Sequence, residues 1–505
     1  MRVRVAACAI VLVAVVAIVH TWTVFSQTVD EPAHVAAGAE WWGGTYALDP
    51  QHPPLARIFV AIGPLLRGGQ YQPAPHWVIS GNAILYGAGD YLATLASARA
   101  GTLLFFLLGC WVVFAWARRL YGDTTALVAL AFFALQPAVL AHAGLATTDM
   151  AAGATLAAAM YAAAFGAPVV AGLAIAAAIA SKFSAIAFLP AVVVAAWWQR
   201  REATCHPERR ARDLGGRGAM DVPGAPPTEI PRYAREDRWV RDVGVAAGVA
   251  ILAILLVYRF DVAALLRGLQ DLRAHNAAGH PSYLFGEVRR GGWWYYFPIA
   301  LFLKTALPAL FAFAMGVRKR TAPLVAAFAI LLGVAMLSRI SIGIRHVLPL
   351  YPLMAIIAAY GVMQLRRPLA IAVIVAQVAT FALAHPDHLA YFNFTAGRDP
   401  SRVLLDSNLD WGQDLLRLEQ ASAKHRIEEL HIAYFGSADL RRHRLPKLVR
   451  LQPFTPATGW IAISEMHLKD LGARNRRRGA YDWLLRHEPV ERVGTSILLY
   501  RVQPR

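Results

Sequence analysis

The chain has 505 residues, of which 57% are hydrophobic and 16% are charged, and its formal net charge is +18. This balance is too apolar for an ordinary soluble enzyme of that length. Apolar runs of about 17–25 residues recur, and each is long enough to cross the ~30 Å hydrocarbon core of a bilayer. The sequence therefore predicts an integral membrane protein, with helical spans because a helix satisfies its own backbone polar groups in lipid.

The first apolar run, residues 5–25, follows Met1-Arg2-Val3-Arg4. We interpret it as an uncleaved membrane anchor, because it is long for a secretion signal and Ser26-Gln27-Thr28 makes a poor small-residue cleavage site. It is the first of about eleven expected transmembrane helices. The others are residues 97–117, 124–142, 150–166, 168–181, 183–198, 243–259, 294–316, 321–338, 345–363 and 368–384.

Short basic loops orient these spans. They are residues 118–119, 199–201, 318–320 and 366–367. With eleven spans and the N-terminus in the cytoplasm, all of these loops lie on the cytoplasmic side, as the positive-inside rule requires. We therefore expect a multi-pass protein of the cell inner (plasma) membrane. The loops also explain much of the positive charge, and no basic surface interleaved with aromatic residues indicates nucleic-acid binding.

Two segments lie outside the expected spans. Residues 199–242 contain few large apolar side chains and are expected to be a disordered cytoplasmic loop within a transmembrane domain of residues 1–384. Residues 385–505 lack long apolar runs and are expected to form a small α/β domain on the extracytoplasmic side. Its expected strands are 403–405, 430–435, 460–463 and 496–500, and its expected helices are 411–423 and 480–486.

The cysteines do not indicate a disulfide framework or a metal site. They are Cys8, Cys110 and Cys205, of which two lie in apolar runs and one in a charged loop. No Cys-x-x-Cys or Cys/His spacing typical of a metal site is present.

The C-terminal part contains a short acidic motif, residues 406–410, which begins like a calcium loop. The calcium pattern requires glycine at its sixth position and glutamate at its twelfth, where this chain has Trp411 and Arg417. The motif therefore predicts a turn before a capped helix. An aromatic ring flanked by acids suits a sugar, so we expect Trp411 to take part in acceptor recognition.

Ionisable side chains from distant segments are expected to meet at the outer membrane face. They are Asp30, Glu31, His34, Asp49 and His52 in the first outer loop, Arg99 near the second span, and Asp149, Lys182, Arg339, Arg345 and His346 in later outer turns. Such residues are costly at a membrane and indicate function. A carboxylate can serve as a general base, and cations can stabilise a leaving phosphate. The set therefore indicates group transfer from a lipid phosphate to a hydroxyl or an amine.

Several of these residues also have a purely structural interpretation. Asp149 could cap the next helix, and Lys182 could extend to the membrane surface. Arg345 and His346 could pair with lipid headgroups, and His52 could belong to a simple turn before two prolines.

The first outer loop carries a recognisable pattern. Asp30-Glu31-x-x-His34, followed by Asp49-x-x-His52-Pro53-Pro54-Leu55-Ala56-Arg57, resembles the corresponding loop of the protein O-mannosyltransferase family. That family belongs to the GT-C superfamily of membrane glycosyltransferases and usually has lysine where Arg57 stands. The resemblance continues in order over roughly residues 1–200, through Arg99, Thr148-Asp149-Met150 and Ser181-Lys182-Phe183-Ser184. The arginine often found beside the second acidic motif is absent.

Residues 344–352 are similar to an Arg-Tyr-x-x-Pro-x-x-Pro segment of bacterial relatives, which include the aminoarabinose transferases of lipid A. The resemblance implies a GT-C-like fold and the inverting transfer of a sugar from a polyprenyl-phosphate donor. It implies Asp30 as general base, with Glu31 and Asp149 positioning donor or acceptor. Lys182 and Arg345 would hold the donor phosphate.

The resemblance implies further substrate-binding positions at His34, His52, Arg99 and His346. It leaves a divalent cation open as a cofactor, because the superfamily contains both kinds of enzyme. Glu31 could join His34 and His52 as a ligand only if the fold brings them together. The β-trefoil inserts of the eukaryotic family are missing, so the acceptor stays open among a glycan, a lipid and a protein.

The main alternative function is transport, because intramembrane charges and many spans also suit a proton-coupled carrier. Carriers often contain internal repeats and charges at the membrane midplane. We find no repeat, and the charges lie at the predicted helix ends. These features and the resemblance favour a transferase.

Overall fold

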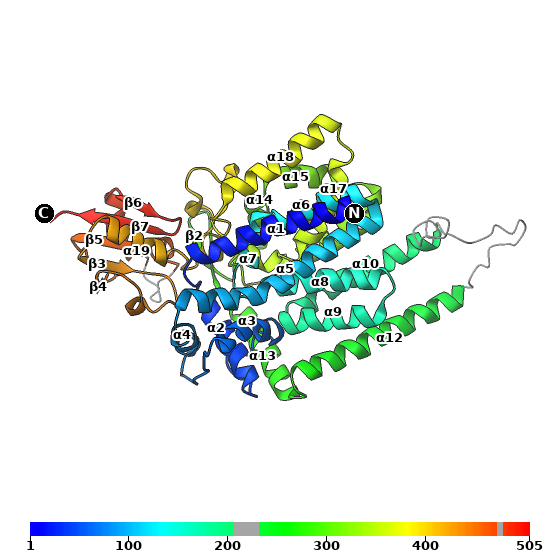
Figure 1. Ribbon diagram of the computed structural model, residues 1–505, viewed down its shortest axis with the longest axis horizontal. Helices are drawn as coiled ribbons and strands as arrows, with labels where there is room; N and C mark the ends of the chain where they lie inside the picture. The colour runs from blue at the N-terminus through cyan, green and yellow to red at the C-terminus, as the bar shows by residue number, and fades with distance from the viewer. Residues whose placement is uncertain (206–231, 472–477, 505) are drawn as a thin grey trace, which may run out of the picture.

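The computed structural model describes residues 1–205, 232–471 and 478–504. A mainly helical part is followed by a small part built on a mixed sheet, which lies at one end of the molecule (Figure 1). The helices up to the first hairpin are α1 (Arg2–Val24), α2 (Glu31–Trp42), α3 (Leu55–Leu66), α4 (Trp77–Gly87), α5 (Tyr91–Tyr121), α6 (Asp123–Ala134), α7 (Pro137–Ala143), α8 (Asp149–Ala164), α9 (Pro168–Ser181), α10 (Ala185–Cys205), α12 (Arg232–Val257) and α13 (Val262–Ala278).

A two-stranded hairpin, β1 (Pro281–Leu284) with β2 (Glu287–Arg290), follows α13. The chain then returns to helices and short 3₁₀ turns. These are α14 (Tyr296–Lys304), α15 (Leu307–Gly316), η1 (Lys319–Thr321), α16 (Ala322–Met336), η2 (Ile344–Val347), α17 (Leu350–Val362) and α18 (Arg367–Ala384), followed by η3 (Phe394–Ala396), η4 (Pro400–Arg402) and η5 (Asp406–Asn408).

The apolar helices make the chain a multi-pass membrane protein. Among the described residues, five helical stretches are long and apolar enough to cross a bilayer: α1, α5, α18, residues 239–257 of α12, and residues 319–336. Two further pairs are bent, α6 with α7 by 64° and α14 with α15 by 113°, which gives up to seven spans. Helices also occupy the other predicted spans, but α8, α9 and α17 have 16, 14 and 13 residues. Because a straight span needs about 20 residues, the total of eleven stays a prediction.

Helix α8 forms the centre of the helical part. It contacts α5, α9, α10 and α17, and most of its residues are buried. Its sequence is rich in alanine, and small side chains let membrane helices approach closely. By contrast, only 6% of the apolar window of α12 and 17% of those of α1 and α18 are buried inside the protein. Helices α1, α12 and α18 therefore present most of their apolar surface to lipid.

The predicted loop 199–242 is wrong at both edges. Helix α10 continues to Cys205, and α12 already begins at Arg232. Residues 206–231, which include His206, lie outside the described part of the chain.

The segment between α1 and α5 contains three short helices, α2, α3 and α4. Proline at the first turn of α2 and Pro54 at the N-cap of α3 suit these starts, because a proline there loses no helical hydrogen bond. Gly38 lets α2 approach α3 closely, since a Cβ atom at this position would lie 2.0 Å from the Arg57 carbonyl oxygen. The segment is thus a packed layer beside the ends of the longer helices.

The C-terminal part contains a five-stranded sheet in the order β4-β3-β5-β7-β6. Strands β4, β3 and β5 are parallel, whereas β7 is antiparallel to both β5 and β6. The elements are α19 (Leu415–Lys424), β3 (Glu429–Ala433), η6 (Leu440–Arg442), β4 (Lys447–Arg450), β5 (Gly459–Ser464), α20 (Glu465–Leu468), η7 (Asp482–Arg486), β6 (Glu491–Val493) and β7 (Ile497–Val502). Apolar side chains of α19 pack on one face of this sheet.

Three predicted strands correspond to β3, β5 and β7, but the predicted strand 403–405 is wrong. Val403 belongs to a turn, and Leu404 and Leu405 are buried but pair with no strand of either sheet among the described residues. Asp406, which follows, has a positive φ of 58°. The predicted helix 411–423 begins only at Leu415, and the predicted helix 480–486 is the 3₁₀ turn η7.

Candidate functional site

Four side chains, Asp30, Arg345, Asp149 and Lys182, alternate in charge at one place in the fold, and we call them the charge chain. Asp30 precedes α2, Asp149 begins α8, Lys182 follows α9, and Arg345 lies in η2. Arg345 Nη1 donates to Asp30 Oδ2 at 2.7 Å and lies 4.0 Å from Asp149 Oδ2. Lys182 Nζ donates to Asp149 Oδ1 at 2.5 Å. The fold therefore joins two acids and two cations from separate elements.

Asp30 is the most accessible member of the charge chain. Its side chain is 29% exposed, whereas that of Asp149 is 2% exposed. Asp149 is enclosed between the two cations, so its charge is compensated on both sides. Asp30 is thus the acid that an incoming molecule can reach, and Asp149 is the acid that fixes Lys182 and Arg345.

Several buried polar atoms near the charge chain have no hydrogen-bond partner among the described residues. They are Arg345 Nε, His346 Nε2, both ring nitrogens of His142, and the hydroxyl oxygens of Thr147 and Ser181. Thr147 lies two residues before Asp149, and Ser181 directly precedes Lys182. A buried polar group without a partner costs about 1–3 kcal/mol. The grouping of such atoms here indicates that a polar molecule completes their hydrogen bonds.

Trp411 reaches the charge chain from the C-terminal part. The guanidinium carbon of Arg345 lies 4.2 Å from the centre of its ring, and the His142 ring lies 6.2 Å away. The residue is 1% exposed. The ring is therefore covered and contacts a cation, and its expected part in acceptor recognition stays a prediction.

Residues 404–414 form hydrogen bonds with the loops that carry the charge chain. Val29, next to the acid that precedes α2, donates its N–H to the Trp411 carbonyl at 2.9 Å. Ile344, next to the cation of η2, donates its N–H to the Asn408 side-chain oxygen at 3.0 Å. Both loops are therefore held by the same segment of the C-terminal part.

Lys304, at the end of α14, is a buried cation that forms no ion pair with a described carboxylate. Its Nζ donates to the carbonyl oxygens of Leu389 at 2.8 Å and Asn408 at 2.6 Å. It also lies 4.2 Å from the centre of the Phe392 ring. Lys304 thus ties the helical part to the segment that supports the charge chain.

Glu31 and Arg99 form a separate, fully enclosed ion pair. Arg99 donates to both carboxylate oxygens of Glu31, at 2.8 and 2.9 Å, and the two side chains are 0% and 1% exposed. The N–H groups of Thr28 and Ala146 also donate to Glu31, at 2.7 and 2.9 Å. Both oxygens of Glu31 are therefore engaged in joining α2, α5 and the chain before α8.

The remaining predicted residues of the first loop surround Arg57, which is 0% exposed. Arg57 forms an ion pair with Asp49 and donates its Nε–H to His34 Nδ1 at 3.0 Å, while His52 bonds Asp49 at 3.0 Å. Burial raises the pKa of Asp49, but His52 and Arg57 lower it more, so that it lies well below its usual range. Burial and then Arg57 lower the pKa of His34 well below its ordinary value. Asp49 is therefore ionised and His34 neutral near pH 7.

A metal ligand set is not found in the part of the chain that the structure describes, since no group of three or more His, Cys, Asp and Glu side chains is placed to hold an ion. The rings of His34 and His52 lie 5.6 Å apart. Glu31 does not complete this pair as a ligand, because Arg99 occupies both of its oxygens.

Sequence reasoning missed the roles of His142, Lys304 and the buried Trp411. His142 and Lys304 lie in runs that were expected to be continuous spans. The structure bends both runs: Lys304 lies at the bend of 113°, and His142 lies in the last turn of α7, beyond the bend of 64°. Pro137 and Pro308 at the first turns of α7 and α15 were signals for these breaks.

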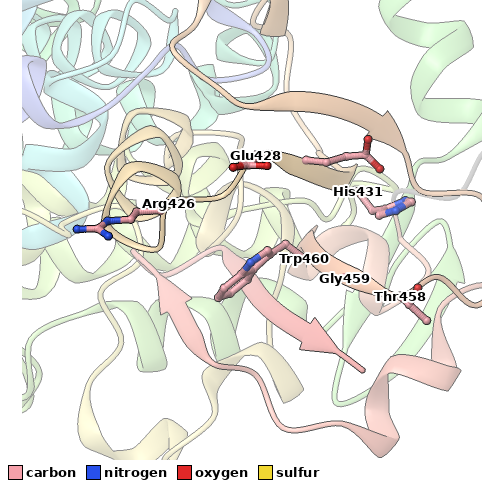
Figure 2. A pocket seen from close by; sticks show the side chains of 7 residues that line it. Arg426, Glu428, His431, Thr458, Gly459 and Trp460 are labelled. Carbon is pink, nitrogen blue, oxygen red and sulfur yellow. The ribbon is translucent and has the colours of Figure 1, made fainter. Parts of the chain in front are cut away.

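The C-terminal sheet carries a shallow cavity of about 310 Å³, lined by Arg426, Glu428, Glu429, His431, Thr458, Gly459 and Trp460 (Figure 2). Glu429 is paired with Lys447 at 2.7 Å, and the Trp460 ring already contacts His425 and Arg501. None of its lining residues has a contact with the charge chain among the interactions described. The charge chain, with its buried and unpartnered groups, is therefore the better candidate site.

No protein-family model and no curated protein matches the chain. Among solved structures, it is similar to ArnT from Cupriavidus metallidurans bound to undecaprenyl phosphate, at 14% identity over 99% of both chains with a TM-score of 0.49. It is also similar to the Archaeoglobus fulgidus oligosaccharyltransferase in complex with zinc and sulfate, at 11% identity and a TM-score of 0.38, over 89% of this chain and 59% of that one. At such TM-scores and identities the likeness does not establish a shared fold or activity.

Proposed function

We propose that the protein is a glycosyltransferase that moves a sugar from a polyprenyl-phosphate donor to an acceptor at the extracytoplasmic membrane face. The observation that carries this proposal is the charge chain, in which the accessible carboxylate of Asp30 lies 2.7 Å from a buried cation. The ordered motifs of the first 200 residues, which resemble those of the protein O-mannosyltransferase family, support the same reaction. The unpartnered buried polar atoms supply donors and acceptors for a sugar phosphate.

Asp30 would act as the general base. It would take the proton of the acceptor hydroxyl or amine while the acceptor atom attacks the anomeric carbon of the donor. The bond between that carbon and the phosphate oxygen breaks, and the electron pair leaves with polyprenyl phosphate. Attack opposite the leaving group inverts the configuration of the sugar carbon.

Lys182 and Arg345 would stabilise the charge that develops on the leaving phosphate. In the free protein Arg345 is bound to Asp30, so a bound donor phosphate would compete with that carboxylate for the guanidinium group. The exchange would release Asp30 for proton transfer only when the donor is present. Asp149 would hold both cations throughout, because it lies next to each of them.

The other predicted residues would act as positioning residues. Glu31 and Arg99 neutralise each other and fix the start of α2, directly after Asp30. His34, Asp49 and His52 surround Arg57 and fix the first outer loop. His346, whose Nε2 has no described partner, is the remaining candidate for a direct hydrogen bond to substrate.

The arrangement of the chain in the membrane is part of this proposal. Residues 1–384 would form the transferase domain of an inner-membrane protein, and residues 385–505 would form an extracytoplasmic domain that supports the charge chain. The acceptor would be a glycan, a lipid or a protein that reaches Asp30 from that side. Among the described residues, no group of three or more His, Cys, Asp and Glu side chains is placed to hold a metal ion, and the proposed roles use none.

The test uses purified full-length protein in detergent with synthetic polyprenyl-phosphate sugars and lysate acceptors, and it quantifies released polyprenyl phosphate. We expect release by the wild type and a loss of about 10²–10⁴-fold in Asp30→Asn, which keeps the shape of the side chain but removes the base. Asp123→Asn is the control, because Asp123 is exposed and pairs with the exposed Arg118.

Equal release by wild type and Asp30→Asn would contradict the assignment of the base. No release from any donor would contradict the transferase and favour the alternative of a carrier, to be tested next by uptake into proteoliposomes.

A further inference from the structure

A groove of about 380 Å³ lies on the outside of the helical part, between α5, α8 and α9, which run alongside one another (Figure 1). It is lined mainly by apolar side chains. The groove extends to Phe165, at the end of α8 opposite Asp149. With a rise of about 1.5 Å per residue, these two ends are roughly 24 Å apart. The end of the groove at Phe165 therefore lies toward the other membrane face, whereas its nearer end at Thr155 is six residues from Asp149, about 9 Å along the helix.

The wall of the groove is aromatic and faces lipid. The Tyr161 ring lies 5.0 Å from the Phe165 ring and 5.9 Å from the Trp111 ring, measured between centres. Trp111, Val170 and Leu173 are each more than half exposed. In a bilayer these apolar side chains contact hydrocarbon, so the natural occupant of the groove is an acyl chain rather than a soluble ligand.

A cation stands at the end of this apolar groove. Arg119 lines it, and its guanidinium carbon lies 3.9 Å from the centre of the Phe165 ring. No carboxylate in the described ranges forms an ion pair with Arg119, although the neighbouring Arg118 pairs with Asp123 at 2.5 Å. Arg119 is therefore a fixed positive charge that is available to an anionic group.

We propose that the groove binds an anionic phospholipid, with an acyl chain along α8 and the headgroup phosphate paired with Arg119. Basic sites between helices at a membrane face recognise anionic headgroups. Burial of an acyl chain gives little selectivity, because the surrounding lipid is equally apolar. Selectivity should therefore depend on the headgroup and on Arg119.

The test uses Trp111 as an internal probe. The full-length protein is placed in nanodiscs of unlabelled phosphatidylcholine, and increasing fractions of phosphatidylglycerol or phosphatidylcholine with brominated acyl chains are added. Bromine quenches tryptophan fluorescence on contact, and the part of the quenching that disappears in Trp111→Phe reports on the groove. We expect half-maximal quenching at a fraction of brominated phosphatidylglycerol that is about fivefold lower than the fraction of brominated phosphatidylcholine. One basic side chain near an anionic lipid gives a preference of about this size.

Matched variants distinguish binding in the groove from a general attraction of anionic lipids to the protein. Arg119→Gln should abolish the preference for phosphatidylglycerol, whereas Arg118→Gln should keep it, because Arg118 already has a partner. Ala158→Leu, which narrows the groove on α8, should reduce quenching by both lipids. Equal quenching by both lipids in the wild type, or a preference that survives Arg119→Gln, would overturn the proposal. The readout is independent of sugar transfer.

Discussion

The guanidinium carbon of Arg345 lies 4.2 Å from the centre of the Trp411 ring. This contact connects a residue of the helical part with a residue of the C-terminal part. The aromatic face stabilises the cation without neutralising it, so Arg345 keeps its charge for the carboxylates beside it. The C-terminal part therefore supports the charge chain by direct contact.

Trp411→Leu should lower kcat/KM for release of polyprenyl phosphate by roughly tenfold, because a buried cation–π contact contributes about 1–2 kcal/mol. Trp411→Phe, which keeps an aromatic face, should lose less. The measurement is the release assay with purified protein of unchanged thermal stability. Trp460→Leu, in the cavity of the C-terminal sheet, is the control and should keep wild-type activity. Equal losses in Trp411→Leu and Trp460→Leu would contradict a specific role for Trp411.

The sequence indicated which residues belong to the candidate site better than how they pair. Asp30, Asp149, Lys182 and Arg345 were identified from their chemistry and motif order, and the fold brings them together. Their pairing depends on contacts over long sequence separations, such as the 315 residues between Asp30 and Arg345. Local patterns carry no information about such contacts.

The helical segments were predictable because apolar runs mark them directly, and Pro137 and Pro308 could have indicated their breaks. The edge of the sheet was not predictable. Strand β4 has only four residues, and β6 has three. Strands of that length lack enough alternating residues to distinguish them from loops. The burial of Trp411 was missed for another reason: its acidic neighbours suggested exposure, although Asp410 and Asp414 are themselves buried and hydrogen-bonded to backbone N–H groups.

Glu31→Gln should destabilise the protein by about 3–5 kcal/mol, because it leaves Arg99 as an unpaired buried charge. The measurement is thermal unfolding in detergent. The double variant Glu31→Gln/Arg99→Met should lose less than the sum of the two single variants, since the charges are removed together. Asp123→Asn, which breaks an exposed pair, should change stability by no more than about 0.5 kcal/mol. An unchanged melting temperature with lost transfer in Glu31→Gln would instead assign Glu31 to the chemistry.

The pH dependence of stability should show the stabilising contribution of the ionised Asp49 carboxylate. The pKa of this carboxyl is lowered in the folded protein, so its ionised form stabilises the fold above the unfolded pKa of about 3.9. That contribution should be complete near neutral pH and should decrease as the pH falls below about 4. Asp49→Asn should therefore melt at a lower temperature than the wild type at pH 7, and the difference should shrink toward pH 3. A difference that is constant over this range would contradict the role of the carboxylate charge.

Gly38→Ala should displace α2 from α3, because the added Cβ atom would lie 2.0 Å from the Arg57 carbonyl oxygen and 2.8 Å from the Ala61 Cβ atom. Both neighbours are fixed in α3, so relief requires movement of a helix, and we expect a loss of about 1–3 kcal/mol. Gly87→Ala is the matched control, since it is also helical and nothing lies within 4 Å of its added atom. That variant should be neutral or slightly more stable, as alanine favours helix. Thermal unfolding of both variants checks the prediction, and equal melting temperatures would show that α2 and α3 can separate at no cost. If α2 does move, Asp30 at its N-cap moves with it, so Gly38→Ala should also lose transfer activity while Gly87→Ala keeps it.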